Sequence, residues 1–227
     1  MSMIERPGFS EWIEGSAFVD GEGVPIVMYH GTDTGSDFNI FALTNEASIG
    51  FHFGDYQAAQ KRIDTISILE EDPGYWGAVV PVVCNARNPL RLTDHFTWEL
   101  GNVCNELYDL GVVDDDQRDY VLESCSEYAL FAAVELAGYD CIVYLNQTEH
   151  DGAPADSLLV WRAEQLKSPY SARFDRGVPG LVSGIPHDPN DFKCWESIKE
   201  ELDSHKEALL DLMSAPQSAI GTAIPGF

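Results

Sequence analysis

Two short apolar segments, each carrying one histidine beside a glycine, constrain this chain more than any other feature. Residues 25–32 (PIVMYHGT) run from an apolar stretch into His30, where a strand is expected to end. Residues 50–54 (GFHFG) alternate aromatic and histidine side chains, so His52 lies on the opposite face of a strand from its two phenylalanine neighbours. The glycines let a ligand approach the backbone closely. The two segments together predict a ligand-binding cleft.

The composition indicates one large domain, or one domain with an appendage. The chain has 227 residues, of which 44% are hydrophobic, and this is enough to build a buried core. Asp and Glu outnumber Lys and Arg by 38 to 13, so the formal net charge is −25. Such a surface repels nucleic-acid phosphates and anionic membranes and attracts basic partners. It indicates either a solvated acidic surface or a docking face for a basic protein.

Five cysteines are present, an odd number without C-x-x-C spacing, so neither a disulfide framework nor a zinc site is indicated. We expect no metal. The first residues lack an apolar stretch of signal-peptide length, and no run is long enough to cross a bilayer. We therefore expect a cytoplasmic protein with no membrane partner.

Local patterns predict both strands and helices along the chain. Apolar runs bounded by turn residues predict strands at residues 17–19, 25–30, 77–84, 90–92, 140–145 and 157–162. Apolar residues at helical spacing predict helices at residues 9–14, 55–66, 191–213 and, two or three in number, within 95–137. Asp55 is the expected N-cap of the second helix. Pro81 is expected at a sheet edge or a bulge.

The C-terminal part differs in character from the rest. Residues 169–190 contain Pro, Gly and Ser and are predicted to form an extended arm. Residues 191–213 are predicted to form an amphipathic helix whose apolar stripe either packs on the core or docks a partner. Residues 214–227 are expected to form a loose tail.

Several of these pieces stand in an order that resembles a known family. They are residues 10–12 (SEW), 19–25 (VDGEGVP), 29–32 (YHGT), 50–54 (GFHFG), 88–90 (NPL), 138–144 (GYDCIVY) and 157–168. Together they resemble the ADP-ribosyltransferases of the diphtheria-toxin and poly-ADP-ribose-polymerase type. The chain is especially similar to the compact versions embedded in polyvalent proteins of phages and mobile elements. The resemblance covers residues 9–168, which form the expected transferase-like domain.

This resemblance implies a fold and a substrate. The implied fold class is α+β, with a split, mostly antiparallel β core, inserted helices and a C-terminal helix. The core would grip the nicotinamide end of NAD, which is the ADP-ribose donor. On this basis His30 hydrogen-bonds a ribose of NAD, the backbone of Gly31 holds the carboxamide, and the Thr32 hydroxyl lies near.

The second histidine is the next expected contact to NAD. His52 stands where the family commonly has a tyrosine that packs on the nicotinamide, and Phe53 and Ser157 complete the expected binding set. A neutral imidazole can stack on nicotinamide, whereas a protonated imidazole opposes the cationic pyridinium. We therefore predict that activity falls in mild acid. Taken alone, His30 and His52 also fit structural roles, as a core histidine and as a solvent-side strand residue.

The catalytic carboxylate has two candidates. The family usually has a Glu at the start of the late strand, but here Ser157 stands before the apolar run, preceded by Asp156. Glu149 lies in the polar loop upstream, where phage-type relatives often carry an Asn-Glu-x-Glu stretch. A carboxylate that accepts a hydrogen bond from the ribose 2′-hydroxyl stabilises an oxocarbenium-like transition state. We expect Glu149 first and Asp156 second in this role; if neither reaches the ribose, the protein is inactive or weakly active.

The leading interpretation is a mono-ADP-ribosyltransferase that transfers ADP-ribose from NAD to a macromolecule and releases nicotinamide. A basic protein is the expected acceptor, because an acidic surface slows the approach of a polyanion. A toxin or effector role and a cognate inhibitor would fit this setting. Two alternatives stay open: a non-catalytic acidic interaction protein of phage or mobile-element origin, which occupies a basic surface or mimics nucleic acid, and an NAD hydrolase.

Overall fold

The strands lie in two separate sheets. The computed structural model describes residues 2–32, 41, 49–69, 77–149, 153–177, 179 and 189–214. One sheet has three strands in the order β1-β3-β7, and the other has four in the order β2-β6-β5-β4. Neighbouring strands are antiparallel, except that β4 and β5 are parallel. Their bounds are β1 (Met28–Thr32), β2 (Phe51–Phe53), β3 (Ala78–Cys84), β4 (Pro89–Leu92), β5 (Cys141–Asn146), β6 (Ala155–Val160) and β7 (Leu166–Lys167).

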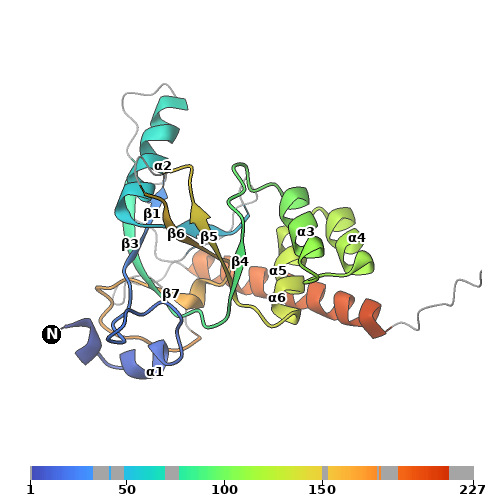
Figure 1. Ribbon diagram of the computed structural model, residues 1–227. Coiled ribbons are helices and arrows are strands. Elements are labelled where there is room, and N and C mark those ends of the chain that lie inside the picture. Colours follow the sequence, from blue (N-terminus) through green and yellow to red (C-terminus); the bar gives the residue numbers. More distant parts are fainter. Residues whose placement is uncertain are drawn as a thin grey trace, which may run out of the picture.

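Helices lie on both sides of these strands. They are η1 (Met3–Glu5), α1 (Phe9–Ile13), α2 (Tyr56–Leu69), α3 (Leu100–Asp109), α4 (Asp115–Ser124), α5 (Glu127–Leu136), η2 (Ala163–Gln165) and α6 (Pro189–Ser214). Figure 1 shows α2 upright beside β1 and β3, and α3, α4 and α5 grouped beyond the four-stranded sheet, with α6 running along α5. The predicted α+β class, with a split and mostly antiparallel core, inserted helices and a C-terminal helix, is confirmed.

Two local predictions about the first half of the chain are confirmed. The Asp55 carboxylate accepts the Ala58 backbone N–H at 2.9 Å and caps α2. Pro81 in β3 pairs with Tyr29, whose own N–H and C=O bond to Gly54 instead. The proline nitrogen therefore faces the other edge of β3, where β7 pairs only with Val83 and Cys84. Pro81 thus occupies a sheet edge and costs the ladder no hydrogen bond.

The N-terminal hairpin is shorter than the sequence predicted. Instead of two strands, a single bridge joins Val19 and Pro25, and β1 begins only at Met28. The Asp20 carboxylate accepts the N–H groups of Glu22 and Val24, each at 2.9 Å, and holds the turn. Backbone hydrogen bonds from Asp20 N–H to Val24 at 2.8 Å and from Ile26 N–H to Phe18 at 3.0 Å flank this bridge, so Pro25 occupies a position where the pairing needs no N–H from it.

The C-terminal helix α6 packs on the core. Leu202 and Leu209 are 2% and 0% exposed, and α6 lies against α5. A half-buried ion pair joins the two helices, because Glu135 of α5 pairs with Lys206 of α6, and Glu135 also accepts hydrogen bonds from Arg162. The predicted stripe is therefore a core face. Residues 178 and 180–188 of the predicted arm, and 215–227 of the predicted tail, lie outside the described residues.

Among the described residues, none of the helices combines the length and apolar character that a bilayer crossing requires.

Candidate active site

The two histidine segments meet where the two sheets join. Tyr29 of β1 and Gly54, the residue after β2, exchange two backbone hydrogen bonds of 2.8 and 3.0 Å. Next to them, His30 Nδ1 donates to the backbone oxygen of His52 at 2.8 Å. We call this junction of β1 and β2 the seam. The half-buried His30 ring also packs on Phe53, with 5.4 Å between ring centroids.

Gly31 is required by the packing of α2 on β1. A Cβ at this position would lie 2.3 Å from the backbone oxygen of Ala59, which no real Cβ contact tolerates. Residues two apart in a strand present their N–H and C=O groups to the same edge, so the backbone of Gly31, like that of Tyr29, is directed toward the seam. Thr32 ends the strand and is 8% exposed. The sequence predicted that Gly31 lets a ligand approach the backbone. The structure shows that the same glycine also lets α2 pack closely on β1.

The His52 ring is held by protein partners at both nitrogens. Its Nε2 donates to the Ile49 carbonyl and its Nδ1 accepts from the Tyr144 hydroxyl, each at 2.9 Å, because a carbonyl oxygen can only accept. Trp98 packs against the ring, with 4.9 Å between centroids. Burial is the main cause that lowers the pKa of His52 to about 3, with a smaller contribution from the positive charge of Arg62. His52 is thus a neutral ring, fixed in one tautomer.

This lowered pKa predicts how stability depends on pH. Between about pH 6.5 and 3 the unfolded chain protonates His52 and the folded protein does not, so its contribution is complete above pH 6.5 and is lost as the pH falls. From pH 7 to 5 we expect His52 to remove about 2 kcal/mol of unfolding free energy. Urea unfolding of the wild type and of His52→Gln at both pH values measures this. Equal pH dependence of the two proteins would contradict it.

The same pKa changes the expectation for activity. A ring with a pKa of about 3 stays neutral from pH 7 to 5. Protonation of His52 therefore gives no reason for the fall in mild acid that the sequence predicted.

A chain of buried polar groups leads from His52 to Glu149. The Ser157 hydroxyl hydrogen-bonds Tyr144, and it accepts from Asn146 Nδ2 at 3.1 Å. The same Asn146 nitrogen donates to Glu149 Oε2 at 2.8 Å, and Asn146 Oδ1 accepts the Glu149 N–H at 3.0 Å. We call these five residues the polar network. Asn146 and Ser157 are each 2% exposed, so the network is rigidly placed inside the protein.

The network reaches the seam through Gly54. A Cβ on Gly54 would lie 2.9 Å from the Ser157 hydroxyl oxygen, so the glycine lets this strand end approach Ser157 closely. Hydrogen bonds therefore connect the predicted residues His52, Ser157 and Glu149 through one network. His30 meets this network through the His52 backbone oxygen, while its ring packs on Phe53, which faces the other side of β2 from the His52 ring.

Phe53 and Asp156 lie elsewhere. Phe53 is 1% exposed and belongs to the core beneath His30. Asp156 precedes Ser157 in β6, so its side chain points to the opposite face of the sheet. There it forms a bidentate, exposed ion pair with Arg91 of β4, at 2.6 and 3.0 Å. Of the two candidate carboxylates, only Glu149 joins the polar network.

A cavity of about 320 Å³ lies on that opposite face. Arg91, Val143 and Asp156 contribute to its wall from the four-stranded sheet, together with Phe18 and Met28 from the N-terminal part of the chain. Ser157 lines the same cavity, so the polar network also reaches this space.

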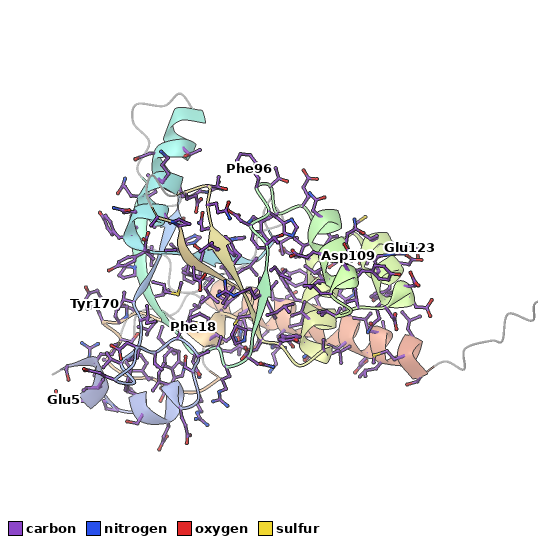
Figure 2. All side chains as sticks on the ribbon, in the orientation of Figure 1. Glu5, Phe18, Phe96, Asp109, Glu123 and Tyr170 are labelled. Atoms are coloured by element: carbon purple, nitrogen blue, oxygen red, sulfur yellow. The ribbon has the colours of Figure 1, made fainter. Side chains whose placement is uncertain are left out.

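The loop between β4 and α3 supports the site from outside. The Asp94 carboxylate accepts the Gln147 N–H at 2.8 Å, which fastens this loop to the one that carries Glu149. Trp98 has a left-handed backbone (φ 45°) and packs on Tyr144, with 4.5 Å between centroids. At the loop tip, Phe96 is 80% exposed, and Figure 2 shows it at the outer end of this loop.

Sequence reasoning missed three residues of this site. Tyr144 was only part of a predicted strand, Asn146 belonged to the polar loop expected after it, and Trp98 was only part of a helical stripe. One signal was available, since residues two apart in a strand share a face and Tyr144 therefore lies beside Asn146. For Trp98, no local pattern indicates a contact with His52.

The described residues contain no group of three or more His, Cys, Asp or Glu side chains arranged to hold a metal ion. The His30 imidazole and the Gly31 backbone lie at the seam, and the polar network connects the seam to the Glu149 carboxylate.

Comparison with known proteins gave one match. A family model described as "ADP-ribosyltransferase in polyvalent proteins" matches residues 20–175, which is more than half of the chain. No curated protein and no solved structure matched the chain. ADP-ribosyltransferase domains in general use NAD as their substrate. The matched span includes both histidine segments, the polar network and the late strand β6, and the chain therefore belongs to the ADP-ribosyltransferase family of polyvalent proteins.

Proposed function

We propose that this protein is a mono-ADP-ribosyltransferase that transfers ADP-ribose from NAD to a protein, with Glu149 as its catalytic carboxylate. The observation that carries the proposal is the hydrogen-bonded chain that links His30, through His52 and Asn146, to Glu149, within a family of ADP-ribosyltransferases. These are the groups needed to orient the nicotinamide ribose and to stabilise positive charge on it.

In the proposed reaction the bond between ribose C1′ and the nicotinamide nitrogen breaks. Nicotinamide leaves with the bonding electron pair as a neutral molecule, and C1′ becomes oxocarbenium-like. Glu149 accepts a hydrogen bond from the ribose 2′-hydroxyl and stabilises this charge more strongly in the transition state than in bound NAD. An acceptor nucleophile then bonds to C1′ and loses its proton to solvent or to a nearby base.

Asn146 and His30 act as positioning residues in this scheme. The Asn146 amide holds both the Glu149 carboxylate and its backbone N–H, so the carboxylate direction is set before substrate arrives. His30 is fixed by its bond to the His52 carbonyl. Pre-ordered groups of this kind lower the entropy lost on reaching the transition state.

A basic protein is the acceptor that the charge distribution favours. The net charge is −25, and much of the positive charge is already paired within the protein. Six described Lys and Arg side chains form ion pairs with the chain's own carboxylates: Arg91, Arg118, Arg162, Arg173, Arg176 and Lys206. The remaining acidic excess attracts cationic partners.

Labelled NAD tests the proposal directly. Wild-type protein is incubated with NAD labelled in the adenosine part and a mixture of basic proteins, beside His30→Ala and the matched control His205→Ala. His205 lies on α6 and bonds the Tyr120 hydroxyl at 2.8 Å, away from the seam. We expect labelled protein with the wild type and with His205→Ala, and a large loss with His30→Ala while thermal unfolding shows it folded.

The other two functions give different results in the same assay. Free nicotinamide without labelled protein would identify an NAD hydrolase. No NAD turnover, together with salt-sensitive binding to a basic protein, would identify a non-catalytic interaction protein.

A further inference from the structure

Arg62 is a cation at the edge of the candidate site that the polar network does not use. It lies on α2 directly above Gly31, since a Cβ on that glycine would be 3.2 Å from the Arg62 Cβ. Its side chain is exposed. It forms no hydrogen bond or ion pair with any residue of the described part of the chain, unlike the six paired cations named above.

The packing of α2 explains why this arginine stands so close to the seam. Ala58 and Ala59, one turn before it, are 2% and 4% exposed and have side chains small enough to bring the helix onto β1. The positive charge of Arg62 also acts on the two rings of the polar network. Burial is the largest influence on the pKa of both His52 and Tyr144, and the charge of Arg62 acts to lower each of them.

This exposed guanidinium is hydrated in the free protein and is available to an anionic ligand. The chain carries a net charge of −25, so its field opposes the approach of any anion, including the doubly charged diphosphate of NAD. A guanidinium offers planar, paired N–H donors that match phosphate oxygens. If the nicotinamide lies against the Gly31 backbone, the diphosphate begins one ribose away, within the span of a long arginine side chain.

We propose that Arg62 binds the diphosphate of NAD and so supplies affinity for the dinucleotide without acting on the bond that breaks. This assignment rests on the proposed function and deepens it. The unpaired guanidinium above Gly31 is the observation that carries it.

Three ligands distinguish diphosphate binding by Arg62 from other roles of this residue. NAD and ADP-ribose contain the diphosphate, whereas nicotinamide has no phosphate at all. Calorimetric titration of wild type and of Arg62→Gln with each ligand is the experiment. We expect the Kd of NAD and of ADP-ribose to rise about 10- to 100-fold in Arg62→Gln, as for loss of a charged hydrogen-bonding partner, and the Kd of nicotinamide to stay unchanged.

Two controls test whether the loss of affinity is specific to Arg62 and to ligand binding. Lys61→Gln removes one charge from the neighbouring position of the same helix, and we expect less than about a threefold change in ADP-ribose affinity, as for a screened surface charge. In turnover assays, Arg62→Gln should raise KM for NAD while kcat changes little, because uniform binding is lost and transition-state stabilisation is kept.

Several outcomes would overturn the assignment. They are an unchanged ADP-ribose affinity in Arg62→Gln, an equal loss in Lys61→Gln, or binding of a short RNA that depends on Arg62 while ADP-ribose binding does not. A wild type that binds neither NAD nor ADP-ribose would overturn the proposed function as well. If the wild type binds NAD and only the prediction for Arg62→Gln fails, the proposal that the protein is a transferase is unaffected.

Discussion

Replacing Glu149 by Gln is expected to slow the release of nicotinamide from NAD by about 10²- to 10³-fold, the usual effect of removing one preorganised charge-stabilising group. Gln keeps the size of the side chain and can still accept from Asn146, so folding should be preserved. It loses the negative charge that would stabilise the oxocarbenium-like centre. Chromatographic measurement of nicotinamide, with kcat and KM for NAD separated, gives the result.

Asp156→Asn is the matched control for this prediction. This substitution removes one negative charge from the other candidate carboxylate. The Asp156 side chain points to the other face of β6 and pairs with Arg91 in solvent. Exposed pairs of this kind contribute at most about 1 kcal/mol to stability, so the variant should stay folded. Because Asp156 does not belong to the polar network, we expect its rate of nicotinamide release to be near that of the wild type. The reverse pattern, with activity lost in Asp156→Asn and kept in Glu149→Gln, would show that the catalytic carboxylate is Asp156.

Replacing both Leu202 and Leu209 by Ala is expected to remove most of the protein's stability against unfolding. Both side chains of α6 are almost fully buried, at 2% and 0% exposure. Each such truncation costs about 2–5 kcal/mol, whereas the whole domain is stabilised by about 5–15 kcal/mol. The two sites are about 10 Å apart along the helix, so their costs should add. Circular dichroism during thermal unfolding measures the loss.

The same helix provides its own control. Leu210 and Leu212 are 47% and 37% exposed, and replacing both by Ala removes the same atoms from the solvent side. We expect a change below about 1 kcal/mol in unfolding free energy. If the two double variants unfold at the same temperature, α6 is not part of the cooperative core.

Most secondary structure could be predicted because it depends on local chemistry. Local sequence patterns predict the Asp55 cap, the apolar run of β3 and the apolar stripe of α6. The shortest elements were less readable: β7 has two residues, and the hairpin at Pro25 was predicted too long. In such cases pairing with a distant strand decides the outcome.

The site was predictable only in part, for a physical reason. Alternation correctly separated His52 from its phenylalanine neighbours, because a strand has a fixed period of two. The partner that fixes the ring, Tyr144, lies 92 residues away in sequence, and only the register of β5 and β6 brings it near. The choice between Glu149 and Asp156 likewise required knowing which face of β6 meets the seam.

The seam has a consequence for how such a site can diverge. Among the described residues, two backbone hydrogen bonds between Tyr29 and Gly54 and one from His30 to the His52 carbonyl connect the halves that carry the reacting groups. Within each sheet, the strands are joined by their own ladder of hydrogen bonds. Aromatic packing, such as that of Phe53 on His30, sets the distance between the two sheets. Substitutions in that aromatic layer can therefore shift one half against the other as a unit. In the proposed transferase, acceptors of a different shape would be accommodated in this way while both ladders stay intact.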